Sequence, residues 1–66
     1  MKELQNYIDG YGFGISVKEL ATKAYRHLRS LGYDTCIVND RYVEVEGTTY
    51  LLSKSRKNGR WIAEAF

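Results

Sequence analysis

The sequence predicts an α+β fold, in which one amphipathic helix packs on an antiparallel β meander of three to four strands. Apolar residues recur at helical spacing between Val17 and Leu31, and from Tyr33 onward β-branched and aromatic residues are separated by turn dipeptides. A chain of 66 residues is near the lower limit for autonomous folding, so a single domain over residues 1–66 is expected.

The sequence marks both ends of the helix. Ser16 and Glu19 form a capping box, which predicts a helix that begins at Val17. Gly32 is expected to end it, because glycine adopts a left-handed backbone conformation without strain. At about 100° per residue, the apolar side chains fall in one arc, which contains Val17, Leu20, Ala21, Ala24, Tyr25, Leu28 and Leu31.

The first 14 residues allow a second, short helix. Leu4, Ile8 and Tyr11 recur in this segment at helical spacing. The glycine-rich run 10–14 would end the helix and link it to residues 15–66, which form the long helix and the meander.

Four strands are expected, and they cover residues 33–38, 41–46, 49–57 and 60–66. Asn39-Asp40 and Asn58-Gly59 are interpreted as two-residue turns, and a third turn is expected at Gly47. This register pairs Cys36 with Val43 and Leu52 with Ala65. The helix-facing side of the sheet would then carry Cys36, Val38, Val43, Val45, Tyr50, Leu52, Trp61, Ala63 and Ala65.

The opposite side of the predicted sheet carries an apolar stripe where water-exposed polar residues would be expected. The stripe is a candidate protein interface and consists of Ile37, Tyr42, Leu51, Ile62 and Phe66. We expect the N-terminal segment, a second copy in a homodimer or a protein partner to cover it. With a partner, the chain would be a protein-binding regulator or inhibitor of the phage, mobile-element or bacterial type, an association that rests on size alone.

The last predicted hairpin is basic and has no acidic residue between Lys54 and Trp61. Lys and Arg contacts to phosphates supply most non-specific affinity for nucleic acids, and a two-stranded ribbon fits the DNA major groove. The alternative is a turn kept soluble by its charge, with Arg56 stacked on Trp61. The candidate nucleic-acid-binding residues, including two from the polar arc of the helix, are Lys54, Arg56, Lys57, Arg60, Trp61, Lys23 and Arg26.

No catalytic, metal or cofactor site is predicted, and no small-molecule substrate. Cys36 is the single cysteine, and His27 has no Cys, Ser or acidic neighbour at the spacing of a catalytic triad. The chain has no apolar stretch of membrane-spanning length and no signal-peptide pattern, so a cytoplasmic protein is expected. The net charge of +2 identifies no partner. We therefore expect a non-enzymatic binding or regulatory module, with DNA or RNA as the first candidate partner.

Overall fold

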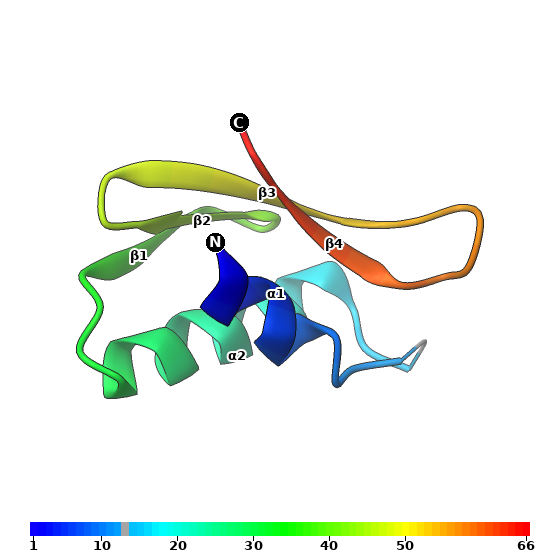
Figure 1. Ribbon diagram of the computed structural model, residues 1–66, viewed down its shortest axis with the longest axis horizontal. Helices are drawn as coiled ribbons and strands as arrows, with labels where there is room; N and C mark the ends of the chain where they lie inside the picture. The colour runs from blue at the N-terminus through cyan, green and yellow to red at the C-terminus, as the bar shows by residue number, and fades with distance from the viewer. Residues whose placement is uncertain (13) are drawn as a thin grey trace.

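The helices lie on one face of an antiparallel sheet, in a two-layer arrangement (Figure 1). The computed structural model describes residues 1–12 and 14–66. These residues form α1 (Lys2–Ile8), α2 (Val17–Ser30), β1 (Thr35–Asn39), β2 (Tyr42–Val45), β3 (Thr48–Lys54) and β4 (Trp61–Ala65). The strand order is β1-β2-β3-β4, so each strand pairs with its neighbour in sequence. The predicted α+β fold with a short N-terminal helix is confirmed.

Helix α2 begins and ends where the sequence predicts. The backbone N–H of Glu19 donates to Ser16 Oγ (3.1 Å), a cap typically worth about 1 kcal/mol. Gly32 follows the helix at a φ of +95°, which a residue with a Cβ adopts only with strain. The apolar arc faces the sheet, and its fully buried residues are Leu20, Ala21, Ala24 and Leu28.

Helix α1 packs beside α2 and beneath β4 (Figure 1). Leu4 and Ile8, one turn apart, are completely buried and join the core that α2 forms with the sheet. α1 therefore does not cover the opposite face of the sheet, and the first of the three predicted coverings, the N-terminal segment, is wrong for this helix. Phe13, which that expectation also included, lies outside the described residues.

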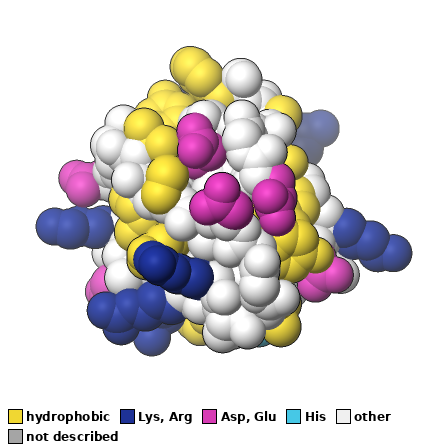
Figure 2. Space-filling view, turned by 90° about the vertical axis from the view of Figure 1, so that its left-hand side faces the viewer, with side chains coloured by type: hydrophobic (Ala, Val, Ile, Leu, Met, Phe, Trp, Pro, Cys, Tyr) yellow, Lys and Arg dark blue, Asp and Glu magenta, His cyan; other side chains and the backbone are white. Residues whose placement is uncertain are grey.

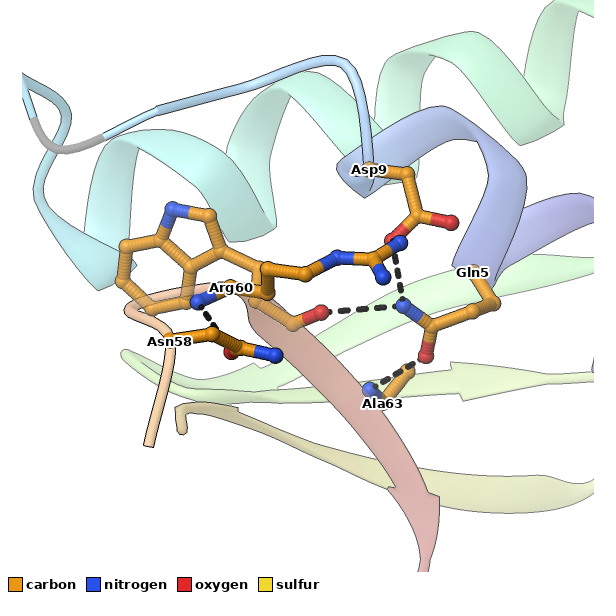
Figure 3. Close-up of polar contacts among 6 residues, drawn as sticks. Gln5, Asp9, Asn58, Arg60 and Ala63 are labelled. Carbon is orange, nitrogen blue, oxygen red and sulfur yellow. Dashed lines mark hydrogen bonds and ion pairs between the residues drawn. The ribbon is translucent and has the colours of Figure 1, made fainter. Parts of the chain in front are cut away.

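The side chain of Gln5 binds the open edge of the sheet (Figure 3). Its Nε2 donates to the carbonyl oxygen of Trp61 (2.9 Å), and its Oε1 accepts from the N–H of Ala63 (2.9 Å). β4 is an edge strand, whose outward backbone groups would otherwise have no strand to pair with. The Gln5 amide thus replaces part of a fifth strand.

The predicted register of β1 is wrong by one residue. Cys36 lies opposite Glu44 rather than Val43, and an irregularity follows between Ile37 and Asn39. The turn lies one residue later than predicted, since Asn39 pairs with Tyr42, and Asn39 Oδ1 accepts from the backbone N–H of Arg41 (3.1 Å). This move alone changes the register by two residues, and the irregularity reduces the change to one. A shift of one residue exchanges the two faces of a strand. Cys36 and Val38 are therefore exposed, whereas Thr35 is buried.

The β3–β4 register differs by an even number of residues, which preserves the faces. Leu52 lies opposite Ala63 rather than Ala65, because residues 55–60 form a longer loop than the predicted Asn58-Gly59 turn. The N–H of Ser55 donates to the carbonyl oxygen of Arg60 (2.7 Å) and closes this loop. Leu52 remains buried, as predicted, whereas Ala65 is exposed.

The turn between β2 and β3 agrees with the prediction at Gly47. Glu46 and Gly47 both have positive φ angles, of 51° and 84°. Two successive positive φ angles are typical of the tight hairpin turns that match the twist of antiparallel strands. The buried residues Val43 and Val45 on β2 therefore face the helices, as predicted.

We predict that Gln5→Ala lowers the free energy of unfolding by about 1–3 kcal/mol, because it removes two part-buried hydrogen bonds that are each typically worth about 0.5–1.5 kcal/mol. The open edge of β4 should also promote association that depends on protein concentration. Chemical denaturation and light scattering measure the two effects. The control is Asn6→Ala, at the exposed neighbouring position of α1. Equal stability of the two variants would contradict a structural role for the Gln5 amide.

Candidate functional site

The β3–β4 hairpin extends beyond the ends of the helices, on the right of Figure 1. We call its four cationic residues, Lys54, Arg56, Lys57 and Arg60, the basic loop. All four are exposed. The loop has a defined conformation, because Ser55 pairs with Arg60 and Asn58 Oδ1 accepts from the Arg60 N–H (3.0 Å). These contacts hold Arg56 and Lys57 at the tip.

Arg60, at the base of the loop, forms an ion pair with the helical layer. Its Nη2 lies 3.3 Å from Asp9 Oδ1, at the end of α1 (Figure 3). Asp9 also accepts a hydrogen bond from Gln5 Nε2 (2.9 Å). The Arg60 side chain is 63% exposed, so water screens the pair and its contribution to stability is small.

Trp61 is buried, although the sequence analysis included it among the nucleic-acid contacts. Only 4% of the residue is exposed, and its Nε1 donates to the carbonyl oxygen of Gly12 (3.2 Å). Its ring therefore cannot stack on a base. Lys54 Nζ lies 5.0 Å from the ring centroid, in the position that the sequence analysis gave to Arg56.

Arg41 is a further cation at this site, and the sequence analysis missed it. Together with Lys54, Val17 and Trp61, it lines a shallow hollow of about 230 Å³ between the start of α2 and the strands. The position of Arg41 depends on the shifted β1–β2 turn. The one local signal in the sequence that could have indicated this position is that Arg41 immediately follows Asn39-Asp40.

Lys23 and Arg26 lie apart from the basic loop. With Lys18, they line a separate hollow of about 310 Å³ on the outward side of α2. The structure therefore divides the predicted nucleic-acid-binding residues between two surfaces.

The end of the molecule opposite the basic loop is acidic. Figure 2 shows acidic side chains gathered near the middle of this end, with Lys and Arg side chains below them and at the margins. The carboxylates here include Asp34 and Glu46. The backbone N–H of Asp34 donates to Glu46 Oε1 (3.4 Å). Charge is therefore distributed unevenly along the sheet.

The sheet face turned away from the helices, which we call the outer face, keeps most of the predicted apolar stripe. Tyr42, Leu51 and Ile62 are half-buried there, and Phe66 is 83% exposed. The rings of Tyr42 and Phe66 meet edge to face, 5.2 Å apart. Ile37 was also predicted on this face, but it lies opposite the core residue Val43 and faces the helix side.

Val38 replaces Ile37 on the outer face because of the register shift in β1. It lines a hollow of about 410 Å³, whose other lining residues are Asn39, Tyr42, Thr49 and Phe66. This hollow has more apolar than polar lining, and it extends across the sheet from β1 to Phe66, the residue that follows β4.

The structure places His27 against Tyr7 and Cys36 beside Glu44. The His27 ring stacks on Tyr7 at 4.2 Å, and burial together with the Tyr11 hydroxyl raises the pKa of Tyr7 to about 12. Cys36 Sγ lies 3.6 Å from Glu44 Oε2. Within residues 1–12 and 14–66, no three His, Cys, Asp or Glu side chains are grouped to hold a metal ion.

A membrane-spanning helix is also absent from the part of the chain that the structure describes. Comparisons of the chain with protein families, with curated proteins and with solved structures found no match.

We predict that Glu44→Gln increases the rate at which iodoacetamide alkylates Cys36 at pH 8. Desolvation and the negative charge of Glu44 raise the pKa of the Cys36 thiol, which lowers the fraction of reactive thiolate. Removing the charge should lower this pKa and raise the rate severalfold, and the difference should disappear at a pH where both thiols are ionised. Glu64→Gln is the control, because it removes a carboxylate without this contact. Equal alkylation rates for Glu44→Gln and the unmodified chain would show that Glu44 does not raise the pKa of Cys36.

Proposed function

We propose that the protein binds nucleic acid through the basic loop, by contacts between its cationic side chains and phosphates. The observation that carries this proposal is the exposure of Arg56 and Lys57 at the tip of a hairpin that extends beyond the helices (Figure 1). No acidic residue occurs between Lys54 and Arg60. A projecting two-stranded ribbon of this kind fits the DNA major groove, which is about 12 Å wide.

The uneven charge distribution also supports binding of nucleic acid at the basic loop. A polyanion is attracted to the end that carries the basic loop and repelled by the end that carries Asp34 and Glu46 (Figure 2). Arg41 and Lys54 extend the cationic surface from the tip towards the start of α2. The approaching nucleic acid would therefore meet the hairpin first.

The burial of Trp61 favours a duplex over a single strand. Proteins that bind single strands combine a cationic groove with exposed aromatic rings on which the bases stack. Trp61, the aromatic residue next to the basic loop in sequence, is in the core. Contacts to the phosphate backbone of a duplex require no such ring.

We predict that the protein binds duplex DNA at about 50 mM salt and that the Arg56→Ala/Lys57→Ala double variant binds more weakly. If Arg41, Lys54, Arg56 and Lys57 each contact one phosphate, the log-log salt slope is about −3.6, and the double variant loses about 1.8 of it. Fluorescence anisotropy at several salt concentrations measures both quantities.

The matched control for this experiment is Lys23→Ala/Arg26→Ala, which removes the same charge from α2. An equal loss of affinity in the two double variants would show that net charge alone, and not the basic loop, determines binding. Absence of binding to duplex DNA by the unmodified protein would refute the proposal.

We further predict that Asp9→Asn strengthens duplex binding, because it releases Arg60 from its ion pair. The gain is at most about fivefold, since exposed ion pairs contribute up to about 1 kcal/mol. The salt slope should become steeper by up to about 0.9. Glu3→Gln makes the same change in net charge on an exposed part of α1 and serves as the control in the anisotropy titration. If both variants gain equally, Arg60 does not contact the nucleic acid.

A further inference from the structure

The outer face has no covering layer in the described chain. Both α1 and α2 pack on the opposite side of the sheet, and Figure 1 shows no other segment crossing the outer face. Val38 and Phe66 are exposed on this face, and Tyr42, Leu51 and Ile62 are half-buried beside them. Grouped apolar side chains of this size on a small domain are typical of an interaction surface.

The apolar side chains lie in successive cross-strand rows. Phe66 is hydrogen-bonded opposite Thr49, Leu51 lies opposite Tyr42, and Ile62 lies opposite Ser53. Each row is two residues further along β3, which corresponds to about 6.6 Å at roughly 3.3 Å per residue. Every row therefore offers at least one large apolar side chain at nearly constant spacing.

This spacing matches the apolar stripe of an α-helix. Side chains at positions i, i+4 and i+8 are separated by about 6 Å each, at 1.5 Å per residue. A helix that lies along β3 can thus place one apolar side chain against each row. The hollow between Val38, Tyr42 and Phe66, of about 410 Å³, is within the range of roughly 300–1,000 Å³ for pockets that bind small molecules and can hold one large apolar side chain.

The charges on the outer face specify the partner further. Glu44 lies in the same row as Phe66, and Glu64 lies opposite Leu51. The described strands place no Lys or Arg on this face: Lys54, the single cationic strand residue, packs over the core residue Trp61. The complementary surface is therefore apolar with flanking cations.

A second copy of the chain does not have this complementarity. In a two-fold dimer through the outer face, each copy presents the same residues. Glu44 and Glu64 would then face an interface that supplies no cation from the strands and contains two further carboxylates. Nucleic acid is disfavoured at the outer face for the same electrostatic reason.

We propose that the outer face binds an amphipathic helix of a protein partner, with large apolar residues at i, i+4 and i+8 and Lys or Arg beside them. The apolar residues contact the Phe66, Leu51 and Ile62 rows, and the largest enters the hollow at Val38. The cations of the helix pair with Glu44 and Glu64. This interaction uses a surface separate from the basic loop and does not depend on nucleic-acid binding.

The test uses a synthetic helical peptide with Leu at i, i+4 and i+8 and Lys at flanking positions. One control peptide carries Glu in place of Lys, and another has the same composition with the Leu residues out of helical phase. Binding is measured by fluorescence anisotropy with the unmodified protein, Phe66→Ala, Glu44→Gln/Glu64→Gln and Leu31→Ala. Leu31 is an exposed apolar residue at the end of α2 and provides the matched control.

We expect the unmodified protein to bind the Lys peptide saturably and neither control peptide. Binding of the Lys peptide should be at least fivefold weaker for Phe66→Ala and for the double Gln variant, and unchanged for Leu31→Ala. The bound peptide should also protect Cys36, which lies on this face beside Glu44, from alkylation. Failure of the Lys peptide to bind, equal binding of the out-of-phase peptide, or an equal loss in Leu31→Ala would overturn it. Sedimentation showing a homodimer that Phe66→Ala dissociates would overturn it in favour of a second copy.

Discussion

The side-chain amide of Gln5 forms backbone hydrogen bonds with β4 at the open edge of the sheet. This contact fixes the position of α1, on which the exposure of the outer face and the anchoring of the hairpin depend. An amide has one donor group and one acceptor, which match the carbonyl oxygen of Trp61 and the N–H of Ala63. The contact places α1 under β4, where Leu4 and Ile8 enter the same core as α2. No helix in the described residues is then left to cover the outer face.

The position of α1 also determines which cations of the hairpin are held. Asp9, at the end of α1, pairs with Arg60 at the base of the loop, and the carbonyl oxygen of Gly12 binds the buried Trp61. Both contacts attach the base of the hairpin to the helical layer. Arg56 and Lys57 lie beyond this attachment, so the structural and the proposed binding residues are separated along the same hairpin.

Sequence reasoning succeeded where the signal is local. The Ser16 cap and the Gly32 stop depend on neighbouring residues, and the predicted helix is confirmed. It failed at the irregularity in β1 between Ile37 and Asn39, which shifts the register by an odd number of residues and exchanges Ile37 for Val38 on the outer face. The contact between Gln5 and Trp61 joins residues 56 positions apart, and no local pattern predicts it. The burial of Trp61 agrees with its predicted helix-facing position, because the longer β3–β4 loop preserves the faces of the strands.

A net charge of +2 conceals two surfaces of opposite character. The hairpin concentrates cations beyond the edge of the core, whereas Glu44 and Glu64 lie among apolar side chains on the outer face. Screening limits electrostatic interactions between exposed charges to about 8–10 Å at physiological salt. The two surfaces adjoin at the base of the hairpin, where Ile62 and Arg60 line the same hollow. The Phe66 row is further away, because Thr49 precedes Lys54 by five residues on β3, or about 16 Å at roughly 3.3 Å per residue. A polyanion at the tip of the basic loop would therefore leave Glu44 and Phe66 free to bind a cationic helix, which allows one small domain to connect two partners of different chemistry.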